Sequence, residues 1–123
     1  MKYFIRVMKA LSEPNRVRIL KLLWSRELCV CELQELLGLA QSTVSKHMRL
    51  LEDAGLITGR RDGAWVIYAI NEAPAIEYAE TMLGILEHWL DDDALLREMN
   101  KRLPFINRLQ ISAGVKASQI EEE

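Results

Sequence analysis

The stretch Glu27–Leu56, written ELCVCELQELLGLAQSTVSKHMRLLEDAGL, decides the fold. Its first part is a short apolar helix pattern that stops at Gly38, a residue typical of helix C-termini. A second helix pattern follows the turn, with Val44, Met48 and Leu51 on its apolar side and small polar or basic residues on the other. Two helices joined by a tight turn, the second with a polar and basic N-terminal half, indicate a helix-turn-helix motif.

A β-hairpin pattern follows directly after these two helices. Two runs rich in β-branched and aromatic residues flank Asp62-Gly63, and we expect this dipeptide to form the two-residue turn, which needs positive φ angles. A hairpin in this place is the wing of a winged helix. Arg60 and Arg61 beside the turn are positioned to contact phosphates, although a solvated hairpin tip is the alternative. The predicted fold class is therefore mainly α with a small β-hairpin, a winged helix-turn-helix.

Helix patterns flank this motif on both sides. Tyr3, Val7 and Leu11 recur at a spacing of four, and a second helix begins near Pro14. A long helix is predicted from Pro74 to about residue 90, followed by a last helix that Asp91-Asp92-Asp93 can cap.

The long helix carries two adjacent apolar stripes, which predict that it packs both on its own domain and on a second copy related by a two-fold axis. We therefore expect a homodimer through the first and the long C-terminal helices; packing within one chain is the alternative. The predicted dimer interface comprises Phe4, Val7, Met8, Ile76, Ala79, Met82, Leu83, Leu86, Trp89 and Leu90.

The composition fits one compact domain. The chain has 123 residues, of which 50% are hydrophobic and 28% charged. We expect residues 1–111 to form the DNA-binding and dimerisation domain and residues 112–123 to form a flexible acidic tail. The opening residues do not resemble a signal peptide, and no run is long enough to span a membrane, so we expect a cytoplasmic protein with reduced thiols.

Charge is distributed unevenly along the chain, although the net charge is only −2. Residues 1–26 carry seven Lys or Arg and one acidic residue, whereas residues 71–98 carry eight acidic residues and one Arg. The basic part can bind a polyanion, while two solvated faces of opposite charge are the simpler alternative.

Three segments together resemble the ArsR/SmtB family of bacterial winged-helix metal-responsive repressors: ALSEPNRVRILKLL, ELCVCELQELLGLAQSTVSKHMRLLEDAGL and TGRRDGAWVIYAI. The resemblance covers residues 6–70 and extends to about residue 90. It implies a homodimer that binds double-stranded operator DNA and leaves it when an inducer ion binds. Because a dimer presents two recognition helices, the operator should be an imperfect inverted repeat.

The second helix of the motif is expected to enter the DNA major groove, which is about 12 Å wide, so that only its outward polar residues reach base edges. For His47, a polar surface position without a role is the alternative. The candidate DNA contacts are Gln41, Ser42, Thr43, Ser45, Lys46, His47 and Arg49 of this helix, Arg60 and Arg61 of the wing, and Arg16 near the start of the second helix.

Both cysteines, Cys29 and Cys31, stand where arsenic-responsive members of the family carry a Cys-Val-Cys motif. Gln34 replaces the third cysteine of the motif Cys-x-Cys-x-x-Cys. The family's site on the long helix lacks its ligands here, since only His88 is present, and no cysteine precedes Cys29 to form an N-terminal site. Two soft thiolate donors favour a soft ion of low coordination number, so we expect As(III) or Sb(III) as the inducer instead of tetrahedral zinc. We expect no organic cofactor.

We expect the first turn of the third helix to contain both thiols, and this leads to two further predictions. The helix N-terminus should lower the thiol pKa values. Residues two apart on a helix project about 200° from each other, so one ion could bind both sulfurs only if the turn unwound and displaced the recognition helix. In the alternative interpretation, Cys29 and Cys31 are small apolar fillers of the core.

Other classes of function are weaker matches. The spacing Cys-x-Cys lacks the two-residue gap of thioredoxin-like motifs, and neither a Ser/His/Asp set nor a phosphate loop is apparent, so we do not expect an enzyme. Two alternatives remain open: a DNA-binding repressor whose cysteine pair is a redox or sulfide switch, and a winged-helix module that binds proteins instead of DNA.

Overall fold

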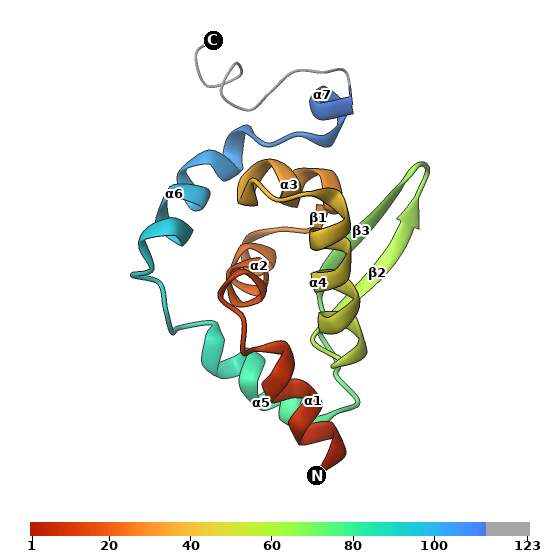
Figure 1. The fold of residues 1–123 in the computed structure, drawn as a ribbon, viewed down its shortest axis with the longest axis vertical. Helices are drawn as coiled ribbons and strands as arrows, with labels where there is room; N and C mark the ends of the chain where they lie inside the picture. The colour runs from red at the N-terminus through yellow and green to blue at the C-terminus, as the bar shows by residue number, and fades with distance from the viewer. Residues whose placement is uncertain (113–123) are drawn as a thin grey trace.

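A computed structural model describes residues 1–112 of the protein (Figure 1). The elements are α1 (Lys2–Ala10), α2 (Pro14–Ser25), β1 (Leu28–Cys29), α3 (Val30–Leu37), α4 (Gln41–Asp53), β2 (Ile57–Asp62), β3 (Trp65–Ile70), α5 (Glu77–Leu86), α6 (Ala94–Arg102), a 3-10 turn η1 (Leu103–Phe105) and α7 (Arg108–Ser112). The predicted fold class, a mainly helical winged helix-turn-helix, is confirmed. Most of the predicted acidic tail lies in residues 113–123, outside the described residues.

The apolar helix α2 lies at the centre of the fold. Figure 1 shows α4 and the β2–β3 hairpin on one side of α2, α6 on the other, and α1 crossing α5 at one end. Leu20 and Leu22 of α2 are fully buried, and Val44, Met48 and Leu51 of α4 pack into the same core. The predicted apolar side of the recognition helix is therefore the side that holds it against the domain.

The sheet has three antiparallel strands in the order β1-β3-β2. Asp62 pairs with Trp65, so the two turn residues are Gly63 and Ala64, one position later than predicted. Gly63 has a φ of 61° at the first turn position, where glycine adopts a positive φ without a steric penalty. The wing is thus confirmed with its turn shifted by one residue.

The helix α5 ends at Leu86, which corrects the prediction of a helix that continues to residue 90. The buried amino group of Lys21 donates hydrogen bonds to the carbonyl oxygens of Leu86 at 2.7 Å and Glu87 at 3.2 Å, and so takes up the last carbonyls of the helix. Leu90 then has a φ of 65°, in the left-handed region. Asp93 starts α6 by accepting a hydrogen bond from the Leu96 backbone at 3.0 Å, as the predicted cap requires.

Part of the predicted dimer interface belongs instead to the core of the chain itself. Val7 and Ala79 are completely buried and Leu83 and Leu86 are 4% exposed, so they offer no surface to a second copy. The physical reason is that α1 turns Val7, and α5 turns the other three, toward their own domain. An exposed apolar surface nevertheless remains at Phe4, Trp89 and Leu90, with Met8, Ile76 and Met82 half-buried.

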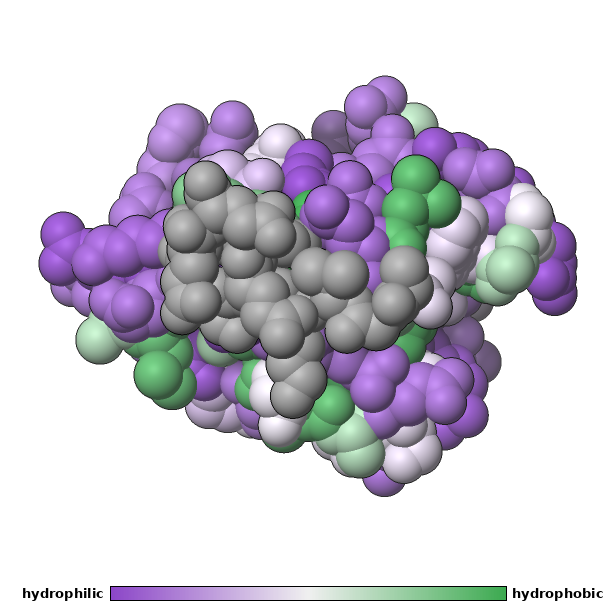
Figure 2. Space-filling model, turned by 90° about the horizontal axis from the view of Figure 1, so that it is seen from above, coloured by the Kyte–Doolittle hydropathy of each residue, from purple (hydrophilic) through white to green (hydrophobic). Residues whose placement is uncertain are grey.

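Seen from the α7 end, the coloured part of the surface is mostly hydrophilic, with separate hydrophobic residues between the hydrophilic ones (Figure 2). Among the described helices, none is both long and apolar enough to cross a membrane.

Candidate functional site

The two thiols lie side by side at the start of α3. The sulfur atoms of Cys29 and Cys31 are 2.8 Å apart. Cys29 is not inside the helix: it ends β1 in an extended conformation, with φ −94° and ψ 171°, and serves as the N-cap residue. The prediction that the first turn must unwind before one ion can bind both sulfurs is therefore wrong, because the projection rule for helical residues does not apply to an extended residue.

Glu32 holds this arrangement and was missed by sequence reasoning. Its carboxylate is completely buried and accepts a hydrogen bond from the Cys29 backbone N–H at 2.9 Å. Arg26 forms an ion pair with the same carboxylate, and Arg108 of α7 lies 3.5 Å from it. The signal in the sequence was the spacing Cys-x-x-Glu, in which a carboxylate at the third helical position reaches back to the N-cap N–H, as in a capping box.

The thiol of Cys29 is hard to ionise in the unliganded protein. Burial raises the pKa of the Cys29 thiol from 9.0 to about 12, and the hydrogen bond with Cys31 is the second largest cause of this increase. The predicted lowering of this pKa by the helix N-terminus is thus contradicted, because desolvation outweighs the dipole. A ligand that bonds to the Cys29 sulfur would therefore displace a proton.

One pocket of about 420 Å³ joins the thiols to both elements of the DNA-binding motif. Cys29 and Cys31 line it together with Gln41 and Ser45 of α4. Its remaining walls come from α3 and from the wing, namely Val30, Gln34, Ala64, Trp65, Val66 and Tyr68. A ligand on the sulfurs would therefore contact the recognition helix and the wing at the same time.

Among the residues that the structure describes, the thiol pair is not part of a larger group of ligands. Within residues 1–112, no three His, Cys, Asp or Glu side chains come together in a way that could hold a metal ion. His88 is exposed, and its Nε2 atom lies 3.9 Å from a carboxylate oxygen of the neighbouring Glu87. The donor set of two soft sulfurs fits an ion of low coordination number, such as As(III) or Sb(III), better than tetrahedral zinc.

The outer side of α4 is polar, basic and open. Ser45 is half-buried and faces the thiol pocket. Within the described part of the chain, neither Lys46 nor Arg49 has a carboxylate within 4.0 Å, whereas Arg18, Lys21 and Arg26 each have one. The exposed predicted contacts on this helix are Gln41, Ser42, Thr43, Lys46 and Arg49.

Arg16 and His47 are instead engaged inside the protein. Arg16 donates hydrogen bonds to the carbonyl oxygens of Ala10 at 2.7 Å and Lys9 at 3.0 Å, at the end of α1. The Nδ1 atom of His47 lies 3.3 Å from Arg16, and its Nε2 atom lies 3.8 Å from Glu13. Burial lowers the pKa of His47, so that its neutral form is favoured. The structure thus gives these two candidate DNA contacts a role in joining α1, α2 and α4.

The two arginines of the wing differ in their contacts. Arg61 is exposed and has no carboxylate partner among residues 1–112, while Arg60 forms an ion pair with Glu27. At the base of the turn, the guanidinium of Arg108 lies 5.6 Å from the ring centre of Trp65 and 3.9 Å from Asp62. The C-terminal helix α7 therefore touches both the wing and the carboxylate that caps the thiol site.

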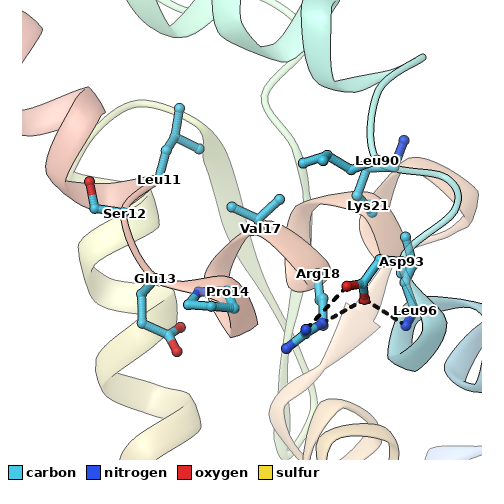
Figure 3. A pocket seen from close by; sticks show the side chains of 10 residues that line it. All are labelled: Leu11, Ser12, Glu13, Pro14, Val17, Arg18, Lys21, Leu90, Asp93 and Leu96. Atoms are coloured by element: carbon cyan, nitrogen blue, oxygen red, sulfur yellow. Dashed lines mark hydrogen bonds and ion pairs between the residues drawn. The ribbon is translucent and has the colours of Figure 1, made fainter.

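A second pocket, of about 360 Å³, lies between the start of α2 and the connection from α5 to α6 (Figure 3). Arg18 and Asp93 point toward one another across it, 2.8 Å apart, and Arg18 lowers the pKa of the Asp93 carboxyl. Leu11, Val17 and Leu90 supply apolar walls. Glu13 and Lys21 also line this pocket, and among the predicted site residues it holds only Leu90.

The comparisons with known proteins agree with this geometry. Residues 13–58 match the family described as "Bacterial regulatory protein, arsR family". The chain is 40% identical over 103 residues to the "Arsenic resistance transcriptional regulator ArsR1" of Pseudomonas putida, covering 78% of this chain and 79% of that protein. It is 39% identical over 80 residues to an "Arsenical resistance operon repressor" of Staphylococcus xylosus, covering 65% of this chain and 76% of the relative.

A solved structure supports the same assignment. The homodimeric winged helix-turn-helix DNA-binding domain of a possible ArsR-family transcriptional regulator from Mycobacterium bovis superposes with a TM-score of 0.61 at 27% identity. The match covers 76% of this chain and 82% of that one. Sequence identity, the match to the family and the arrangement of helices and wing lead to one conclusion: the chain belongs to the ArsR family of bacterial regulatory proteins.

Proposed function

We propose that this protein is a transcriptional repressor of a metalloid-resistance operon, and that it leaves its operator when As(III) or Sb(III) binds Cys29 and Cys31. The observation that carries the proposal is the shared pocket, in which the two sulfurs face Gln41 and Ser45 of the recognition helix. The names of its relatives in Pseudomonas putida and Staphylococcus xylosus support arsenic as the signal.

The DNA-binding side follows from the exposed polar face of α4. This helix enters the major groove of a double-stranded operator, where Gln41, Ser42 and Thr43 at its N-terminus reach base edges. Lys46, Arg49 and Arg61 bind phosphates, because among the described residues they have no carboxylate partner to displace. The protein acts in the cytoplasm, where its thiols stay reduced.

The protein functions as a homodimer on an imperfect inverted repeat. The exposed apolar side chains of Phe4, Trp89 and Leu90 form the surface that a second copy covers. Phe4 contacts Tyr78 edge to face, with ring centres 5.4 Å apart, which joins α1 to α5 on this surface. The homodimeric state of the domain from Mycobacterium bovis supports this assembly.

The binding step is a ligand exchange without oxidation or reduction. Arsenous acid, As(OH)₃, reacts with the two thiols: two As–S bonds form, two As–O bonds break, and the protons of Cys29 and Cys31 leave in two molecules of water. The third arsenic ligand remains a hydroxide. Arsenic then replaces the hydrogen bond between the sulfurs and occupies the pocket beside Gln41 and Ser45. If the ligand fits the pocket only after α4 shifts, ligand binding lowers the affinity for DNA. The free energy of this coupling is reciprocal, so bound DNA lowers the affinity for the ligand by the same amount.

A gel shift on the DNA upstream of the gene for this protein tests the proposal. Arsenite, antimonite, cadmium and zinc are titrated against the bound complex of the wild type, of Cys29→Ser, of Cys31→Ser and of the double variant. We expect arsenite and antimonite to release the wild type and to leave the double variant bound. His88→Ala is the matched control and should behave as wild type, because His88 is exposed and does not line the thiol pocket. Unchanged release of the double variant contradicts the proposal.

A redox or sulfide switch is the second candidate, and the 2.8 Å distance between the sulfurs favours it, since thiols this close can react with one another. Release by peroxide or polysulfide but not by arsenite would select this candidate. A protein-interaction module is the third: it would show no duplex binding that weakens as salt increases.

A further inference from the structure

We propose that the basic side of α1 is a second surface for DNA phosphates, and that it continues the contact surface of α4 along the operator backbone. This inference rests on the proposed function, because it extends the DNA-binding surface of the proposed repressor. Three features carry it: a row of cations without carboxylate partners, a groove that joins this row to α4, and the position of the row away from the apolar dimer surface.

The cations follow one side of α1. Lys2, Arg6 and Lys9 are spaced four and three residues apart, so their side chains are neighbours on the helix surface. All three are exposed, and among residues 1–112 none of them has a carboxylate within 4.0 Å. The charged groups of Lys2 and Arg6 lie 5.7 Å and 5.6 Å from the ring centre of Tyr3, a contact that leaves their charge in place. A phosphate can therefore bind this row without displacing a carboxylate.

A groove of about 600 Å³ joins this row to the recognition helix. The three cations of α1 line it on one side, and Leu50 and Asp53 of α4 line it on the other. Arg16 also lines the groove, where the carbonyl oxygens of Ala10 and Lys9 hold its guanidinium. Among its lining residues, four cations thus stand against the single carboxylate of Asp53, so the groove favours an anion.

The groove lies at the end of the row of α4 that carries the proposed phosphate contacts. Lys46, Arg49 and Asp53 are spaced three and four residues apart, so they share one side of α4. Lys46 precedes Asp53 by about 10 Å along the helix axis, at roughly 1.5 Å per residue. Each strand of B-DNA carries a phosphate about every 3.4 Å of helix axis, so a backbone in contact with Lys46 has further phosphates within this distance. The cations of α1 therefore continue the charge of α4.

The basic row stays open in the proposed homodimer. Phe4 and Met8 belong to the predicted dimer surface and, at about 100° per residue, project roughly 150° around the axis of α1 from the basic row. A second copy that covers Phe4 leaves Lys2, Arg6 and Lys9 exposed. DNA and the second copy thus use different sides of α1.

Fluorescence anisotropy of the full-length protein on labelled operator DNA, at several salt concentrations, tests the inference. In Arg6→Gln/Lys9→Gln, the slope of log K against log salt should decrease by about 2, because each lost phosphate contact reduces it by about 1. The matched control is Arg97→Gln/Lys101→Gln, which removes two exposed cations from α6, on the other side of α2 (Figure 1), and should keep the wild-type slope. Because glutamine has a helix propensity close to that of lysine and arginine, we expect both variants to fold, and circular dichroism checks this.

A second variant should change the affinity in the opposite direction. The carboxylate of Asp53 repels a phosphate that enters the groove, so Asp53→Asn should strengthen operator binding several-fold at low salt and less at high salt. Asp92→Asn is the matched control, because Asp92 is exposed, lies just before α6 and changes the net charge by the same amount. Its affinity should stay within about twofold of wild type.

Three results overturn the inference: an unchanged slope in Arg6→Gln/Lys9→Gln, an equal decrease in the α6 control, or equal strengthening by Asp53→Asn and Asp92→Asn. A smaller slope in Lys46→Ala and Arg49→Ala, together with a wild-type slope in the α1 variant, refutes the inference and leaves the proposed function intact. Absence of salt-dependent binding in the wild type refutes both.

Discussion

Replacement of the buried carboxylate Glu32 should destabilise the protein strongly. Glu32 accepts the Cys29 backbone N–H at 2.9 Å and pairs with Arg26 and with Arg108, 3.5 Å away. In Glu32→Ala the lost cap costs about 1 kcal/mol. Loss of a buried ion pair costs about 3–5 kcal/mol when both partners are buried, but the Arg26 and Arg108 side chains are 36% and 30% exposed and regain water. We therefore expect a total loss of about 2–3 kcal/mol in the free energy of unfolding.

The isostere Glu32→Gln separates the two contributions. Its amide oxygen still accepts the Cys29 N–H, so that only the charge is lost and the cost should be about 1–2 kcal/mol. Glu98→Ala is the matched control: Glu98 and its partner Lys101 are 67% and 73% exposed, and the change should stay within about 0.5 kcal/mol.

Urea unfolding at one fixed protein concentration, followed by circular dichroism, measures these differences. For a domain of this size, the loss in Glu32→Ala corresponds to a decrease in Tm of about 10–20 °C. If Glu32→Ala unfolds at the same urea concentration as Glu98→Ala, or if Glu32→Gln is as harmful as Glu32→Ala, our account of how the thiol site is held is refuted.

Three further predictions follow from the structure. First, the pKa of Cys29 is raised from 9.0 to about 12, so over this pH range the folded state keeps a proton that the unfolded state loses. The free energy of unfolding should therefore decrease as pH rises from about 9 to 12, and urea titrations at several pH values should show a smaller decrease in Cys29→Ser. Second, Lys46→Ala and Arg49→Ala should each weaken operator binding and reduce the slope of log K against log salt by about 1, as measured by fluorescence anisotropy. Arg97→Ala on α6 is the control, and an unchanged slope in both α4 variants contradicts the predicted interface. Third, Gly63→Ala should cost about 1 kcal/mol in thermal unfolding because of its φ of 61°, although its Cβ would meet no atom within 4 Å; full stability would show that the turn adapts.

The fold was predictable because its signals are local. The spacing of apolar residues in α4, Gly38 after α3 and the glycine of the wing each act within a few residues, so they indicate an element without knowledge of its partners. The shift of the turn by one residue has a simple cause: the strand pair Asp62–Trp65 is set by cross-strand pairing, which a dipeptide does not encode.

The geometry of the thiol site was not predictable for the opposite reason. Leu28 and Cys29 are extended because they pair with Tyr68 and Ile67 of β3, nearly 40 residues later in the chain. This pairing removes Cys29 from the helix, brings the sulfurs together and buries the thiol, so it reverses both the unwinding and the pKa predictions.

The extent of α5 and the dimer surface also depend on distant contacts. The amino group of Lys21 takes up the last carbonyls of α5 from 65 residues away, and no pattern within the helix indicates this. The two apolar stripes predicted two partners for α5: the structure shows the partner within the chain, and the second copy stays a prediction. Ala79 and Leu83 are buried in the chain's own core, and the spacing of apolar residues within α5 does not indicate this.

We propose that metalloid binding at the two thiols and DNA binding at α4 oppose one another. Fluorescence anisotropy with labelled operator DNA measures it most directly, as the ratio of the dissociation constants for DNA with and without saturating arsenite. We predict an increase of about tenfold or more for the wild type and no increase for Cys29→Ser/Cys31→Ser, which corresponds to a coupling free energy of at least about 1.4 kcal/mol. An equal increase in both proteins, or none in the wild type, would contradict the claim.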